Sequence, residues 1–90
     1  MQAVDFMSHS IVVAKATDGE VHYFHVPGDR TQAKQEVLAM LRERRQLTDE
    51  LGRTYGPWEI DATSVELAPP DLDSSYPPFG IDGKRIRQTR

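Results

Sequence analysis

Cysteine is absent from the 90-residue sequence, so a disulfide framework, a thiolate zinc site and a thiol nucleophile are all excluded. No uninterrupted apolar run approaches the roughly 18 residues that a membrane-spanning helix needs. The N-terminus lacks the positive start and the long apolar core of a secretory signal, and we therefore expect an intracellular, cytoplasmic protein. The length leaves room for one small domain and excludes a two-domain enzyme.

Basic residues are missing from one long stretch of the chain. Positions 54–83 hold no Lys or Arg, whereas the last seven residues, 84–90, hold four basic groups and no acid. The whole chain carries a net charge of −3, and without that basic end seven basic residues stand against fourteen acidic ones, a net charge of −7. An acidic body repels the phosphates of nucleic acids, so the charge distribution disfavours nucleic-acid binding.

Sequence motifs for nucleotide binding and for nucleophilic catalysis are missing too. There is no Walker A motif, no dinucleotide fingerprint and no G-x-S-x-G. His22 and His25 are expected on opposite faces of one strand, which disfavours a metal site. Glu59 and Asp61 have the spacing of a carboxylate pair on one strand face, but a solvated strand gives the same pattern. We therefore expect no enzyme, no cofactor and no metal.

Two runs rich in β-branched residues, 9–16 and 20–26, flank the dipeptide Asp18-Gly19. Asp-Gly between apolar runs predicts a hairpin with a two-residue type I′ turn. The resulting register pairs Ala14 with Tyr23 and defines two faces of the hairpin. One face holds Val12, Ala14, Ala16, Val21, Tyr23 and His25. The other face holds Ile11, Val13, Phe24 and Val26, with Lys15 and His22 near the turn.

The next segment, residues 30–51, has the pattern of an amphipathic helix. Asp29 is a good N-cap, Gln32 completes a pair resembling a capping box, and Gly52 stands where a helix would stop. The apolar stripe comprises Ala33, Val37, Met40, Leu41, Leu47 and Leu51. Arg44 falls inside this stripe. We expect its guanidinium either to extend to the domain edge or to pair with a carboxylate.

Residues 57–63 alternate apolar and polar side chains, which predicts a third strand with Trp58, Ile60 and Ala62 buried. The expected fold is therefore α+β, a β-β-α-β unit with a three-stranded antiparallel sheet of order 2-1-3 and one helix on one face. Residues 1–67 make up this domain. Residues 68–90 are expected to form a Pro-rich extended segment with a basic C-terminus.

One helix covers only one face of the sheet, so the apolar second face predicts a contact surface. We expect a small non-enzymatic protein–protein interaction module that uses this face, the C-terminal segment, or both. Its partner would be another protein or a second copy of the chain. The predicted interface residues are Val12, Ala14, Val21, Tyr23, His25, Arg44, Tyr76 and Phe79.

Two alternatives stay open, and neither involves a membrane. A nucleic-acid binder would use the arginines of the helix and the basic end as phosphate contacts. Those residues are Arg42, Arg45, Arg53, Lys84, Arg85, Arg87 and Arg90. The acid-rich stretch 54–83 indicates instead a small acidic inhibitor that imitates nucleic acid for a basic target.

Overall fold

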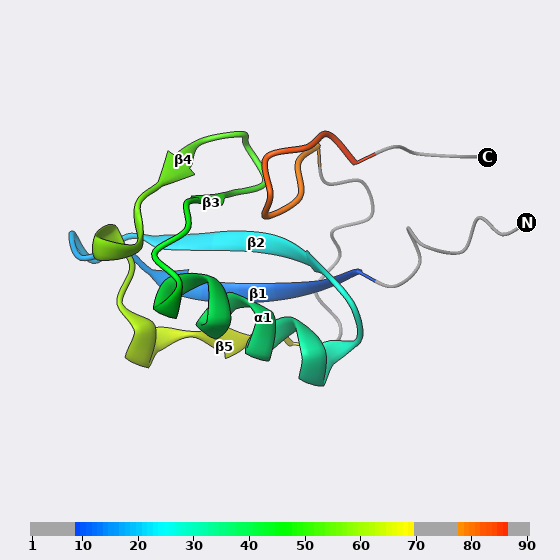
Figure 1. Cartoon of the computed structure of the whole chain (residues 1–90), viewed down its shortest axis with the longest axis horizontal. Coiled ribbons are helices and arrows are strands. Elements are labelled where there is room, and N and C mark those ends of the chain that lie inside the picture. Colours follow the sequence, from blue (N-terminus) through cyan, green and yellow to red (C-terminus); the bar gives the residue numbers. More distant parts are fainter. Residues whose placement is uncertain (1–8, 70–77, 87–90) are drawn as a thin grey trace, which may run out of the picture.

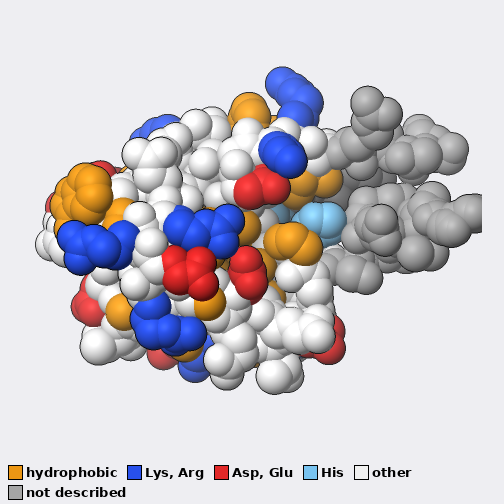
Figure 2. All heavy atoms as spheres, viewed as in Figure 1, with side chains coloured by type: hydrophobic (Ala, Val, Ile, Leu, Met, Phe, Trp, Pro, Cys, Tyr) orange, Lys and Arg blue, Asp and Glu red, His pale blue; other side chains and the backbone are white. Residues whose placement is uncertain are grey.

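The computed structural model describes residues 9–69 and 78–86. Its centre is an antiparallel sheet of order β2-β1-β5, formed by β1 (His9–Lys15), β2 (Val21–Pro27) and β5 (Glu66–Leu67). Helix α1 (Arg30–Arg42) lies on one face, beside a small sheet of β3 (Leu47–Thr48) and β4 (Thr54–Tyr55) (Figure 1). Acidic and basic side chains are interspersed over the face seen in this view (Figure 2). The predicted α+β class and the sheet order are confirmed.

The register of β1 on β2 differs from the prediction by one residue. Lys15 pairs with Val21, and the loop between them closes with the amide of Ala16 donating to the carbonyl of Glu20. Gly19, at φ 91°, takes the left-handed conformation at the third loop position. A type I turn followed by such a glycine is the usual three-residue hairpin loop, and it uses the Asp-Gly pair differently from a type I′ turn.

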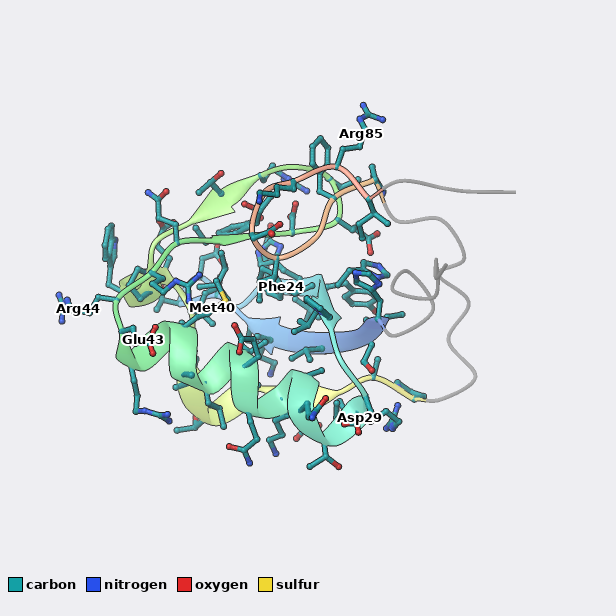
Figure 3. All side chains as sticks on the ribbon, turned by 45° about the vertical axis from the view of Figure 1, so that its right-hand side comes forward. Phe24, Asp29, Met40, Glu43, Arg44 and Arg85 are labelled. Atoms are coloured by element: carbon teal, nitrogen blue, oxygen red, sulfur yellow. The ribbon has the colours of Figure 1, made fainter. Side chains whose placement is uncertain are left out.

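This shift exchanges the two faces of β1, because successive side chains of a strand alternate. Val12 and Ala14 are fully buried beneath α1, so the prediction that they lie on the open face is wrong. The buried core comprises Val12, Ala14, Phe24, Val26, Ala33, Val37, Met40, Leu47, Ile60, Val65 and Ile81. Phe24 and Met40 mark its centre in Figure 3. The opposite sheet face carries Ile11, Val13, Lys15, Val21, Tyr23 and His25.

The start of α1 agrees with the prediction, and its end does not. Asp29 caps the helix, with its side chain accepting a 2.9 Å hydrogen bond from the amide of Gln32. The helix ends at Arg42 and leaves Leu47 and Leu51 outside it. Leu47 instead enters the core from β3, while Leu51 is exposed.

A Schellman motif ends the helix. Arg44 has φ 60°, and the amides of Arg44 and Arg45 donate to the carbonyls of Leu41 and Met40. Glycine usually takes this left-handed position, so an arginine there hides the stop from sequence patterns. Arg44 is exposed and points away from the body (Figure 3), and the prediction that it lies within the apolar stripe is wrong.

Residues 57–63 do not form the predicted third strand. They contribute the 3-10 helix Pro57–Glu59 and the start of a second, Ala62–Ser64, with Ile60 between them in an isolated bridge to Ala16. Trp58 is 70% exposed and Ala62 is exposed as well, so only Ile60 of the three residues predicted to be buried is buried. The third strand is β5, only two residues long and further along the chain. The 3-10 turns break the alternation because Asp61 caps the second one through the amide of Thr63.

Residues 78–86 form a second hairpin whose turn repeats the first. Gly80 donates to the carbonyl of Lys84, and Asp82 Oδ1 accepts from the amide of Lys84, as Asp18 Oδ1 does from that of Glu20. Ile81 is buried in the core, where its amide donates to the carbonyl of His25. This part of the predicted extended segment therefore packs on the body. No helix within residues 9–69 and 78–86 has the length and apolarity to cross a membrane.

Candidate functional site

A surface groove with a volume of about 270 Å³ lies between β2 and the turn that joins β3 to β4. Its lining residues are Val21, His22, Tyr23, Asp49, Glu50, Leu51 and Arg53. The turn is held against the edge of β2 because the amide of Glu50 donates to the carbonyl of Tyr23 at 3.2 Å. We call this feature the edge groove.

The walls of the edge groove expose apolar side chains. Among the described residues three large hydrophobic side chains are exposed, and two of them, Val21 at 48% and Leu51 at 60%, line the groove. Tyr23 beside them is half-buried. Charged groups complete the lining, with the side chains of Glu50 and Arg53 38% and 61% exposed. An apolar centre with a charged border is the usual anatomy of a polypeptide contact.

Asp49 forms the floor of the edge groove and is only 2% exposed. Its Oδ1 accepts 2.9 Å hydrogen bonds from the amides of Leu51 and Arg53, and its Oδ2 accepts from the hydroxyl of Tyr55 at 3.0 Å. The Nε of Arg53 lies 3.7 Å from Oδ2. A buried carboxylate is tolerated when it is hydrogen-bonded in this way. Asp49 therefore holds the turn that presents Leu51 and Arg53.

The Tyr55 hydroxyl also lies 3.1 Å from Nδ1 of His22. Its one proton goes to Asp49, since a carboxylate only accepts, so the hydroxyl oxygen accepts the Nδ1–H of His22. Burial, with the hydrogen bond to Asp49 next, raises the pKa of Tyr55 to about 12. The phenol thus stays protonated, which is the opposite of an activated nucleophile. This chain of contacts orients the imidazole.

Three side chains of a kind that binds metals meet at the first hairpin. Asp18, Glu20 and His22 each offer one ligand atom, and these atoms all lie within 4.8 Å of one another. The two acids are exposed, and His22 is 8% exposed. The prediction of no metal site rests on the opposite orientations of His22 and His25 and does not take the acids of the hairpin loop into account. The three positions follow one another at i, i+2 and i+4, and this pattern in the sequence indicates that the side chains lie on one side of the chain.

His25 lies on the other face of β2 and is 2% exposed, so it is not accessible as the predicted interface residue. Its Nε2 has no hydrogen-bond partner, and Glu50 Oε1 is 3.8 Å away. Burial, followed by the nearby His9, lowers the pKa of His25 to about 4. The imidazole is therefore neutral at physiological pH.

The structure brings only part of the predicted interface together. Val21 and Tyr23 line the edge groove, and Phe79 packs against Gly52 in the adjoining turn. Tyr76 lies outside the described residues. Asp49 and Leu51 were not among the predicted site residues, since both were assigned to the helix.

The predicted phosphate contacts are scattered and partly neutralised. Arg45 lies 3.5 Å from Glu43, and Arg53 faces Asp49. Arg42 ends α1, whereas Lys84 and Arg85 belong to the second hairpin, with the guanidinium of Arg85 5.6 Å from the ring centre of Phe79. The face seen in Figure 2 accordingly shows mixed charge and no continuous basic stripe. Arg87 and Arg90 lie outside the described residues.

No family model, no curated protein and no solved structure matches this chain significantly. Function is therefore inferred from the groove and from the chemistry of its residues.

Proposed function

We propose that the protein is a non-enzymatic interaction module that binds a segment of another polypeptide, or of a second copy of itself, in the edge groove. The observation that carries this proposal is the exposure of Val21 and Leu51 in the lining of one groove. Single exposed aliphatic side chains are common on protein surfaces. Two that line the same groove offer an inserted side chain a shared apolar contact.

The apolar area that a partner would cover determines the expected binding free energy. Covering the exposed parts of Val21 and Leu51 contributes about 2–4 kcal/mol at the usual value per unit of apolar area. A contribution of this size is typical of the central contact in a weak, reversible complex. Glu50 and Arg53 give the border both signs of charge, which favours a partner segment with an apolar anchor flanked by mixed charges.

The polar network beneath the groove supports binding over catalysis. The carboxylate of Asp49 accepts hydrogen bonds from two backbone amides and from the Tyr55 hydroxyl, and these bonds hold the turn in place. The pKa of Tyr55 is raised to about 12, first by burial and then by Asp49, which keeps its proton in place. The sheet face opposite α1, on which Ile11 and Val13 are half-buried, adjoins the groove through Val21 and Tyr23 and can extend the contact.

The test is affinity capture from the cells that make the protein, with wild type and Leu51→Glu as bait. Gln35→Glu, at an exposed position of α1, is the matched control because it adds the same charge elsewhere. The proposal expects one polypeptide to be retained by wild type and by the control and lost with Leu51→Glu. If Leu51→Glu retains the same polypeptide in the same amount, the groove is not its binding site. Sedimentation over a range of concentrations identifies a second copy of the chain as the partner.

A further inference from the structure

We propose that Asp18, Glu20 and His22 form a binding site for one divalent transition-metal cation, with Zn²⁺ as the ion to test first. Their ligand atoms lie within 4.8 Å of one another at the end of the first hairpin. This site is independent of the proposed polypeptide contact, although His22 also lines the edge groove. It brings together one nitrogen and two oxygen donors, a set that suits zinc and its neighbours better than Ca²⁺ or Mg²⁺.

The orientation of His22 is the observation that goes beyond a cluster of acids. Histidines that bind metals usually donate their second ring N–H to a carboxylate or another acceptor, which selects the tautomer and holds the ring. Here Nδ1–H donates to the Tyr55 hydroxyl, which in turn donates to the buried carboxylate of Asp49. Nε2 is the nitrogen that remains to bind a cation. The ring is 8% exposed, so its position is determined by packing as well.

A hydrogen bond to the backbone also positions the side chain of Asp18. Its Oδ1 accepts a 2.9 Å hydrogen bond from the amide of Glu20, which leaves Oδ2 free. Zinc binds nitrogen and oxygen ligands at about 2.0–2.2 Å, so ligand atoms around one ion lie at most about 4 Å apart. The ligand atoms lie within 4.8 Å of one another, so an ion has to draw them closer, and the two acids that would approach the imidazole are both exposed.

Charge favours occupancy by a cation. Two carboxylates beside the lone pair of an imidazole nitrogen repel one another, and a divalent cation converts these repulsions into attractions. Because each ligand must be deprotonated to bind a metal, protons compete with the cation for this site. Three protein ligands leave a fourth position for water.

The experiment is a calorimetric titration of the full chain with ZnCl₂, combined with ¹⁵N NMR of the histidine rings. We expect saturation at one ion per chain and a change in the Nε2 signal of His22, with the Nδ1–H tautomer retained. Glu20→Gln and Asp18→Asn should each weaken binding at least tenfold. Asn at position 18 keeps an oxygen for the amide of Glu20, so the turn is preserved. Glu66→Gln, which neutralises an exposed acid on β5, is the matched control and should bind as wild type does.

Three results would overturn the proposal. They are the lack of saturable Zn²⁺ binding, equal affinity in Glu20→Gln and Glu66→Gln, and a zinc-induced change at His9 or His25 in place of His22. His22→Gln is not the deciding variant, because it also removes the contact to Tyr55. Loss of polypeptide capture with Leu51→Glu has no bearing on these outcomes, so the two proposals fail separately.

Discussion

The ring of Phe79 packs directly on Gly52. A Cβ added at position 52 would stand 2.8 Å from Cε2 of that ring, closer than side chains approach one another. Gly52 also has φ +85°, a left-handed conformation that other residues adopt only under strain. The contact connects the second hairpin to the turn that carries Leu51 and Arg53, so residues near the C-terminus support one wall of the edge groove.

Gly52→Ala should destabilise the protein by about 2–4 kcal/mol, because it combines backbone strain with the clash against Phe79. Gly19→Ala is the matched control: φ is +91° there, but no atom lies within 4 Å of the added Cβ. It should cost about 1 kcal/mol, from backbone strain alone. Urea unfolding followed by circular dichroism measures both. Equal losses for the two variants would mean that Phe79 yields freely and does not support the turn.

Arg44→Gly should stabilise the protein by about 0.5–1 kcal/mol. Arg44 occupies the left-handed position of the Schellman motif at φ 60°, where glycine carries no steric penalty. Arg45→Gly is the control, since position 45 does not have a positive φ and glycine there only adds freedom to the unfolded chain. Thermal melts of wild type and the two variants measure this, and Arg44→Gly should have the highest melting temperature and Arg45→Gly the lowest. A variant at position 44 that melts below wild type would contradict the assignment of the motif.

Lowering the pH should destabilise the protein through His25. Burial, and after it His9, lowers the pKa of His25 from 6.5 in the unfolded chain to about 4 in the folded protein. The unfolded state therefore binds more protons between these values, and the free energy of unfolding falls as the pH drops from about 6.5 to about 4. The loss is at most about 3 kcal/mol, and above pH 6.5 this contribution is constant.

Urea unfolding of wild type and His25→Leu at pH 7, 5.5 and 4 isolates this effect, because carboxylates that titrate in the same range are common to both proteins. Wild type should lose more stability than the variant as the pH falls. A difference between the two proteins that does not change with pH would show that His25 gains its proton as readily in the folded protein as in the unfolded chain.

Local signals in the sequence predicted much of the fold. The first two strands and the Asp29 cap followed from β-branched runs and capping chemistry. The order of the sheet followed from the apolar composition of the first strand, which favours the central position. The register of β1 did not follow, because Asp-Gly fits a two-residue and a three-residue loop equally well. Only packing decides between them, and it places Val12 and Ala14 under α1.

The candidate site was harder to predict than the fold. It depends on where α1 ends, and the left-handed residue there is Arg44 in place of a glycine. With the helix extended to residue 51, Asp49 and Leu51 were assigned to a helix and not to a turn beside β2. Val21 and Tyr23 were identified because alternation within β2 is independent of the β1 register.

Photo-crosslinking at position 51 tests the proposed binding role most directly. The protein, carrying benzoylphenylalanine in place of Leu51, is irradiated in the cells that make it, and adducts are identified by mass spectrometry. The same amino acid in place of Gln35 on α1 is the control. The edge groove as a polypeptide-binding site predicts one discrete protein adduct from position 51 and none from position 35. Adducts from both positions alike, or a nucleic-acid adduct from position 51, would contradict it.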